Sequence, residues 1–372
     1  MTEAAVTVAE RGRSLWADAW ARLRANKAAM IGIAYLLLVA LLCVLGPFLT
    51  PNSFSTIHKN YTRVAPSLSP YPTPEMIEPA LADAIKRGRL DLAGWEQEGD
   101  RLILSVTSTR EIDERVTRYV DRSDMFENTR VTELAPGGMT AKMETEVELK
   151  YFFFGTDSTG RDLLTRTLIA GRVSLAIGLL AGLVAVVIGV AYGAVAGFIG
   201  GKIDEVMMRI VDILYSLPFI FFVIMLVVFF GRNFVLMFIA VGAVMWLDMA
   251  RIVRGQTLAL RRQEFVQAAE ALGVGRVGIL IRHIVPNLLG PVVIYMTLLV
   301  PQVIILESFL SYLGLGVQEP MSSWGVLISQ GAKNMPGANW MLFFPAFLLI
   351  STLFALNFIG DGLRDALDPK DR

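Results

Sequence analysis

The sequence predicts an all-α polytopic membrane protein that carries one α+β insertion. Hydrophobic residues make up 54% of its 372 residues and the mean hydropathy is +0.54, which is too apolar for an ordinary soluble domain. Six hydrophobic stretches have about the length that crosses the ~30 Å hydrocarbon core of a bilayer. Between the first two, residues 51–150 hold 17 of the 34 acidic residues, so this segment is a different kind of structure.

The overall composition also limits the chemistry. Lys+Arg and Asp+Glu both number 34, so net charge gives no indication of a nucleic-acid partner. Cys43 is the single cysteine, which excludes an intramolecular disulfide and a cysteine metal cluster, and His58 and His283 are too few for a histidine-rich metal site. No nucleophile and base form a recognisable pair. We therefore predict no catalytic, cofactor-binding or metal-binding residue.

The N-terminal segment, residues 1–27, is basic, and Trp16, Trp20 and Leu23 recur at near-helical spacing. This pattern predicts an amphipathic helix at the membrane surface. Residues 28–49 form the first predicted span. A signal peptide is the alternative, but the long polar lead, the length of the run and the lack of an A-x-A site argue against it. The basic residues before the span predict a cytoplasmic N-terminus.

Residues 51–150 are predicted to form a small extracytoplasmic domain, because a single crossing precedes them. Alternating patterns at 101–107 and 142–151 predict β-strands, and residues 81–92 predict a short helix. A long flexible loop remains the alternative at this point. The next segment, 151–172, has polar residues suited to helix starts: Thr156 and Asp157 as caps.

The core, residues 173–361, contains the other spans and is followed by a predicted cytoplasmic tail, 362–372. The spans are 173–199, 210–230 with a bend at 216–218, 234–249, 291–310 and 341–359, with a polar turn at 200–209 and an outer loop at 311–340. Glycines spaced four apart on the second span, Gly178/Gly182 and Gly189/Gly193, predict close helix contacts. These contacts could form with a partner subunit or within this chain.

The polar segment 263–287 separates the fourth and fifth spans. Phe265, Ala268, Ala269 and Leu272 recur at i, i+3, i+4 and i+7, which predicts one face of a short helix. Gly273 follows as a helix C-terminal residue, and Pro286 is expected to end a second short helix. Six arginines in 251–290, against Arg232 and Lys333 in the outer segments 231–233 and 311–340, predict a cytoplasmic location. Such a helix is suited to docking on a soluble partner.

This segment resembles the "EAA" coupling loop of bacterial ABC-importer permeases, which docks on the ATP-hydrolysing subunit. The usual glutamate before the paired alanines is Gln267 here, and Glu270 is the alternative carrier of that charge. The resemblance implies a docking role for ten residues: Phe265, Gln267, Ala268, Ala269, Glu270, Leu272, Gly273, His283, Pro286 and Asn287.

Three further segments resemble the same family, most closely its dipeptide/oligopeptide C-type permeases. Two of these segments are 307–325 and 360–369. The third is a signature before the second span, with Gly155, Thr156, Asp157, Gly160, Arg161, Asp162 and Arg166. Asp162 and Arg166 are spaced to pair across one helical turn, and the arginines of this outer segment are expected to be paired. A phosphate-binding loop of the G-x-x-x-x-G-K-(S/T) type is absent from the sequence.

The resemblance implies a type I ABC importer permease core in the inner membrane, with both termini cytoplasmic. It also implies a B-type permease partner, two ATPase subunits that hold ATP and Mg, an extracytoplasmic substrate-binding protein, and peptides as cargo. The alternatives are an ion- or proton-coupled secondary transporter and a membrane enzyme. Secondary transporters place charges near the bilayer midplane, and no charge is clearly there.

For three further ionisable residues the sequence predicts a structural interaction. Glu307 lies near the outer end of a span, where a helix cap or a pair with another subunit is expected. Asp248 is three residues before Arg251, so an i, i+3 ion pair is expected. For His283 we expect a structural hydrogen bond.

Overall fold

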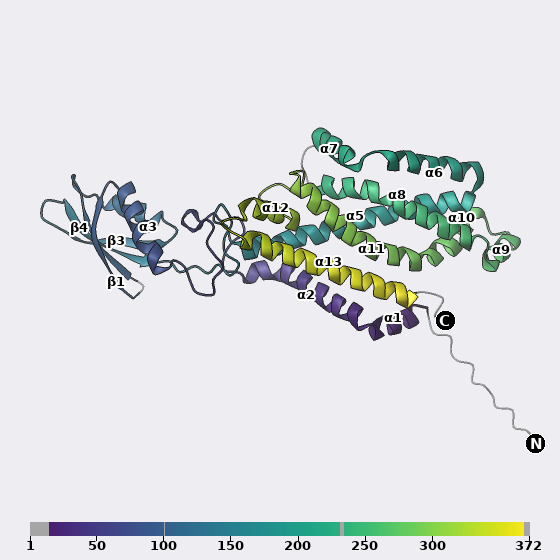
Figure 1. The fold of residues 1–372 in the computed structure, drawn as a ribbon, viewed down its shortest axis with the longest axis horizontal. Helices are drawn as coiled ribbons and strands as arrows, with labels where there is room; N and C mark the ends of the chain where they lie inside the picture. The colour runs from purple at the N-terminus through teal and green to yellow at the C-terminus, as the bar shows by residue number, and fades with distance from the viewer. Residues whose placement is uncertain (1–14, 100, 231–233, 368–372) are drawn as a thin grey trace, which may run out of the picture. The chain divides into compact units, whose positions relative to one another are not determined.

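The computed structural model describes residues 15–99, 101–230 and 234–367, which separate into two compact units (Figure 1). One unit, the helical unit, comprises 1–41, 172–319 and 348–372. The other, the sheet unit, comprises 42–171 and 320–347. Residues 1–14 and 368–372, which include parts of the predicted N-terminal helix and tail, lie outside the described residues, as does Arg232.

The long helices of the chain are α2, Lys27–Leu49; α5, Leu163–Ile199; α8, Phe234–Leu260; α11, Val285–Tyr312; and α13, Trp340–Leu367. The shorter ones in the helical unit are α1, Leu15–Ala25; α6, Gly201–Ser216; α7, Phe219–Phe230; α9, Glu264–Ala271; and α10, Arg276–Ile279. Side chains of α5, α8 and α11 form most of its buried core, for example Ile177, Met249 and Val303.

The glycines of α5 pack against helices of this same chain. A Cβ at Gly178 would lie 2.8 Å from the Ile304 side chain of α11, and one at Gly189 would lie 2.6 Å from Met249 of α8. Because such a distance leaves no room for a side chain, the small residues let α5 approach both neighbours closely. The two alternatives for this face are thereby decided in favour of packing within the chain.

Within the described residues, four helices are long and apolar enough to cross a membrane: α2, α5, the continuous run Arg276–Tyr312, and α13. The two remaining predicted spans, 210–230 and 234–249, are not among these four helices, so six crossings stay a prediction. The predicted polar turn at 200–209 is wrong, because α6 already begins at Gly201, directly after Gly200 with φ of 70°.

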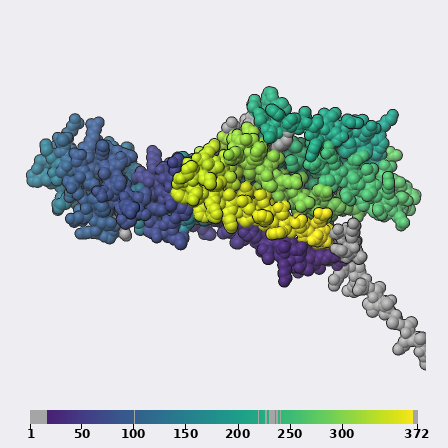
Figure 2. All heavy atoms as spheres, in the orientation of Figure 1, coloured from purple at the N-terminus to yellow at the C-terminus, as the bar shows by residue number. Residues whose placement is uncertain are grey.

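The predicted span 210–230 is not one bent helix. It breaks into α6 and α7 at Leu217, which is extended with φ of −75° and ψ of 134°. Pro218 follows, and a proline disfavours helical geometry in the residue before it. The space-filling view shows α6 (teal) at the surface of the helical unit (Figure 2), and its exposed side chains include Ile203, Val206 and Ile210.

In the sheet unit, four antiparallel strands lie in the order β1-β2-β4-β3. They are β1, Asp91–Glu98; β2, Arg101–Thr107; β3, Phe126–Leu134; and β4, Thr140–Val147. Helices α3, Pro74–Arg87, and α4, Thr117–Asp121, pack on the sheet. Leu102 and Leu104 of β2 are fully buried, as are Leu81 and Met143, so this segment forms its own core and is not a flexible loop.

Several boundaries differ from the sequence prediction. The helix expected at 81–92 runs from Pro74 to Arg87, because Pro74 suits a first helical turn and Arg89, with φ of 59°, leaves the helix before β1. The strand expected at 142–151 ends at Val147. The expected loop 311–340 contains α12, Trp324–Asn334, whose first turn is capped by Ser323: its side chain accepts a hydrogen bond from the Val326 N–H.

Candidate functional site

The loop 263–287 presents a short helix, α9, held to the helical unit by one face. Val266 and Ala269 of α9 are buried in the same cluster as Ile279 and Ile284. Phe265 is 40% exposed and Leu272 is 83% exposed. The predicted apolar stripe is therefore divided, because Ala269 anchors α9 while Phe265, Ala268 and Leu272 face outward.

Gly273 ends α9 in the expected conformation, with φ of 78°. The Gly273 N–H donates to the Glu270 carbonyl at 3.0 Å, and the Val274 N–H donates to the Ala269 carbonyl at 3.1 Å. These two bonds are the Schellman arrangement, which satisfies the last carbonyls of a helix. The turn fixes the direction in which the chain leaves α9.

Pro286 does not end the second short helix, so that prediction is wrong. A π-helical turn, Leu280–Ile284, joins α10 to α11, and Pro286 lies in the first turn of α11. A proline is tolerated there because the amide N–H of a first turn has no partner within the helix. The Asn287 Nδ2 donates to the His283 carbonyl at 2.6 Å, so the hydrogen bond at His283 is made by its backbone.

Gln267 and Glu270 have different surroundings. The Gln267 Nε2 donates to the Arg262 carbonyl at 3.3 Å, which turns this amide back onto its own segment. Glu270 lines a cavity of about 710 Å³ together with Arg261 and Arg276. Glu270 therefore shares the lining of this cavity with two arginines, whereas Gln267 does not line it.

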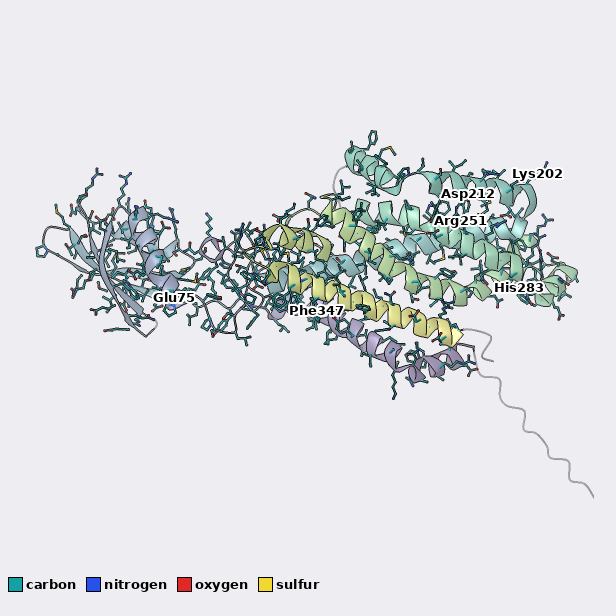
Figure 3. All side chains as sticks on the ribbon, in the orientation of Figure 1. Glu75, Lys202, Asp212, Arg251, His283 and Phe347 are labelled. Carbon is teal, nitrogen blue, oxygen red and sulfur yellow. The ribbon has the colours of Figure 1, made fainter. Side chains whose placement is uncertain are left out.

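Two arginine–aspartate pairs join α8 to α6. The Arg254 guanidinium binds both carboxylate oxygens of Asp204 at 2.5 and 2.6 Å. The Arg251 Nη2 lies 2.8 Å from the Asp212 Oδ1 (Figure 3). The predicted Asp248–Arg251 pair is therefore wrong, because Asp212 on the neighbouring helix is better placed than a residue one turn away.

Glu307 is fully buried inside the helical unit. Its carboxylate accepts hydrogen bonds from the Ser311 Oγ at 2.6 Å and from the Ser174 Oγ at 3.3 Å. Ser311 lies one turn further along α11, and Ser174 belongs to α5. The expected pair with another subunit is wrong for this residue, because its partners are in its own chain.

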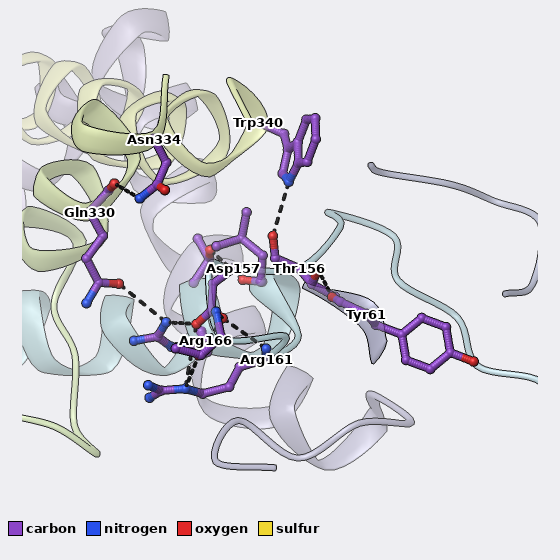
Figure 4. A network of polar contacts seen from close by, with 11 residues as sticks. Tyr61, Thr156, Asp157, Arg161, Arg166, Gln330, Asn334 and Trp340 are labelled. Atoms are coloured by element: carbon purple, nitrogen blue, oxygen red, sulfur yellow. Dashed lines mark hydrogen bonds and ion pairs between the residues drawn. The ribbon is translucent and has the colours of Figure 1, made fainter. Parts of the chain in front are cut away.

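Two arginines of the signature, Arg161 and Arg166, meet at the buried carboxylate of Asp157 (Figure 4). Asp157 binds Arg166, and its Oδ2 lies 3.6 Å from the Arg161 Nε. Its Oδ1 also accepts the N–H groups of Thr159 at 2.7 Å and Arg161 at 3.0 Å. The prediction that the three arginines of this segment, Arg161, Arg166 and Arg172, are paired is confirmed for Arg161 and Arg166.

The helix cap differs from expectation. Asp162, not Asp157, caps α5: its Oδ2 accepts the Thr165 N–H at 2.8 Å. Asp162 therefore does not pair with Arg166, since Arg166 extends to Asp157. Burial raises the pKa of the Asp162 carboxyl above its ordinary value, against the lowering effect of the hydrogen bonds from Thr165 and Asn52.

Backbone contacts explain the two signature glycines. Gly155 and Gly160 have φ of 73° and 85°, and a Cβ at Gly160 would collide with the His58 carbonyl. Thr156 donates its hydroxyl to the Tyr61 carbonyl and accepts the Val64 N–H at 2.8 Å. The signature is therefore folded against the segment that begins the 51–150 insertion.

Sequence reasoning missed two partners of the signature, Trp340 and Gln330, and a third residue, Asn334, that binds one of them. The Trp340 indole donates to the Thr156 carbonyl at 3.2 Å, and Gln330 Oε1 accepts from Arg166 at 3.4 Å. Asn334 donates to the Gln330 carbonyl at 2.8 Å. These residues lie more than 150 positions away from the signature in sequence, and only the amphipathic pattern of 324–334 could have indicated the helix that carries Gln330 and Asn334.

Comparison with known proteins shows two family matches. A family of binding-protein-dependent transport system inner membrane components matches residues 189–372, and the N-terminal TM domain of oligopeptide transport permease C matches residues 14–70. The oligopeptide transport system permease protein OppC of Escherichia coli (strain K12) is 66% identical over 220 residues, 59% of this chain and 73% of OppC. The chain belongs to the binding-protein-dependent transport system permeases.

The dipeptide transport system permease protein DppC of Bacillus subtilis (strain 168) is 36% identical to this permease over 356 residues, 95% of this chain and 86% of DppC. A match of that length includes most of the 51–150 insertion. Among solved structures, the inward-facing MetNI methionine ABC transporter has a TM-score of 0.46 at 19% identity, covering 55% of this permease and 96% of the MetNI chain.

The predicted function class is confirmed. This permease is an inner membrane subunit of an ABC importer and not itself an enzyme. The comparisons give no support to a secondary transporter.

Proposed function

We propose that this permease forms, with a B-type permease, the path by which di- or oligopeptides cross the inner membrane. The names of its relatives OppC and DppC support the cargo class. Two ATPase subunits would bind ATP and Mg, and an extracytoplasmic binding protein would deliver the peptide. The arginine-rich segment 251–290 supports a cytoplasmic location for the loop 263–287 and for both termini.

The observation that carries the coupling role is the exposed face of α9. Phe265 and Leu272 project from a helix whose opposite face is anchored by Val266 and Ala269. A rigid helix with exposed apolar side chains fits the groove-binding mode of helix recognition. ATP-driven closure of the ATPases would move the loops together and favour the outward-open state of the permease pair, and hydrolysis would reverse the preference.

The proposal is tested by assembly and uptake in one preparation. Tagged permease, expressed with the B-type permease, ATPases and binding protein of its own transport system, should retain all membrane partners and take up a radiolabelled tripeptide in proteoliposomes only with ATP. Assembly with ATP hydrolysis but no uptake of any di- or tripeptide would contradict the cargo class. Loss of the ATPases from an intact permease pair would contradict the assembly.

The position of the loop charge gives a first prediction. If Glu270 replaces the family glutamate, Glu270→Ala should lower transport-coupled ATPase activity more than Gln267→Ala does. The expected difference is about tenfold or more, since a hydrogen bond to a charged group contributes ~1.5–3 kcal/mol, each ~1.4 kcal/mol is tenfold, and Gln267 is turned toward Arg262. ATPase rates of the purified complexes, with and without loaded binding protein, measure it. If Gln267→Ala lowers ATPase activity as much as Glu270→Ala or more, Glu270 does not replace the family glutamate.

The insertion gives a second prediction. The backbones of Tyr71 and Lys150 exchange two hydrogen bonds of 2.8 Å, so a short Gly-Ser linker can replace residues 73–148 without separating these ends. We expect membrane insertion and pairing with the B-type permease to survive, because the spans and the signature contacts remain. Peptide uptake should fall. Wild-type uptake by this variant would show that the sheet is dispensable for transport.

A further inference from the structure

A cavity of about 360 Å³ lies between α8 and α11. This volume is in the lower part of the range for small-molecule sites, about 300–1,000 Å³. Asp248 and Arg251 of α8 line it, with Tyr295 and Gln302 of α11. All of these residues belong to the helical unit, and none of them is part of the loop 263–287 or of the signature.

The Asp248 carboxylate differs from the other charged groups near this cavity in its interactions. Arg251 is already engaged, since its guanidinium binds Asp212 and lies 4.4 Å from the centre of the Tyr215 ring. Over the described ranges 15–99, 101–230 and 234–367, no hydrogen bond or ion pair reaches Asp248. The two aspartates of α6, Asp204 and Asp212, each have an arginine.

An uncompensated carboxylate in an apolar helix has a physical consequence. Water or a cation solvates such a group, and ionisable residues that face a cavity within a bundle of transport helices mark the routes of ions and substrates. Asp248 is half-buried and faces the cavity that Tyr295 and Gln302 also line. A charge that opens into a cavity inside a transport subunit is therefore placed to meet a passing solute.

The other polar side chains of the cavity indicate which hydrogen-bonding groups a solute would need. Tyr295 and Gln302 are seven residues apart on α11, so they lie on one helical face two turns apart. Their oxygen atoms accept hydrogen bonds, and no hydrogen bond engages either side chain within the described ranges. An ammonium group has three N–H donors and no acceptor. The carboxylate can pair with such a group, and a neutral acceptor of the same cavity can take a further N–H.

We propose that this cavity is a subsite for an ammonium group of the transported peptide, with Asp248 as its counter-ion. The proposal rests on the proposed peptide import and adds a recognition site within the permease. The α-amino group and a lysine side chain share this chemistry, and the experiment separates them.

The test compares wild type with Asp248→Asn in the complete transporter, using trialanine, Ala-Lys-Ala and Ala-Glu-Ala. Each peptide's uptake by the variant is divided by its own wild-type uptake, so that the preference of the unchanged binding protein cancels. We expect Asp248→Asn to lower uptake about tenfold, the loss that follows from one charged hydrogen-bond partner. Glu205→Gln, which neutralises an exposed carboxylate of α6, is the matched control and should change nothing.

A larger loss for Ala-Lys-Ala than for Ala-Glu-Ala would support the lysine side chain as the occupant. An equal loss for all peptides, restored by Asp248→Glu with the B-type permease still bound, would support the α-amino group. No loss, or an equal loss that glutamate does not restore, or loss of the B-type permease from the complex, would overturn the proposal. Wild-type protein that imports none of the peptides would instead contradict the proposed function.

Discussion

Replacing Gly273 by valine is expected to uncouple ATP hydrolysis from uptake while leaving the permease inserted and paired. Gly273 has φ of 78°, and nothing lies within 4 Å of the position that a Cβ would take. The effect is therefore purely one of backbone conformation, because a β-branched residue at positive φ costs about 1–2 kcal/mol. Relief of that strain would break the Schellman turn and redirect the chain after α9.

The chain offers a matched control two residues later. Gly275 also has open space around a built Cβ, but its φ is −64°. Gly275→Val adds the same side chain at a conformation that valine adopts readily, so it should retain coupling. Pull-down of the ATPases and the B-type permease, with uptake measured in parallel, decides the result. A Gly273→Val variant that holds its ATPases and transports normally would show that the loop is not the coupling element.

Replacing Asp157 by asparagine should destabilise the sheet unit strongly. The Arg166 side chain is 2% exposed and binds this carboxylate, so the substitution removes a negative charge that a buried cation contacts directly. Breaking a buried pair in this way costs about 3–5 kcal/mol. We expect a lower melting temperature of the purified protein in detergent and faster protease cleavage of residues 51–150.

Asp83 provides the comparison for this variant. It pairs with Arg87 at 2.5 Å in the same unit, but both side chains are about 60% exposed. An exposed pair contributes about 0–1 kcal/mol because water screens it, so Asp83→Asn should leave the melting temperature nearly unchanged. Equal shifts for the two variants would mean that the Asp157 network does not hold the unit together.

The sequence by itself determined the family, the apolar helices and the conformation at Gly273, because these depend on composition and on local spacing. A helix of small and apolar residues is recognised from a few consecutive turns, and a glycine after an apolar stripe has a local reason to take positive φ. The strand 101–107 is likewise visible in its own alternation and coincides with β2.

Only the tertiary structure decided which charged groups meet. Local spacing favoured Asp248–Arg251 and Asp162–Arg166, yet Arg251 binds Asp212 and Arg166 binds Asp157. An ion pair forms where two side chains reach each other in space, and a carboxylate on a neighbouring helix or turn competes with one along the same helix. For the same reason, the sequence could not show that Glu307 contacts Ser174, which is 133 residues away. The sequence could not show the cavity at Asp248 either, because residues of both α8 and α11 line it.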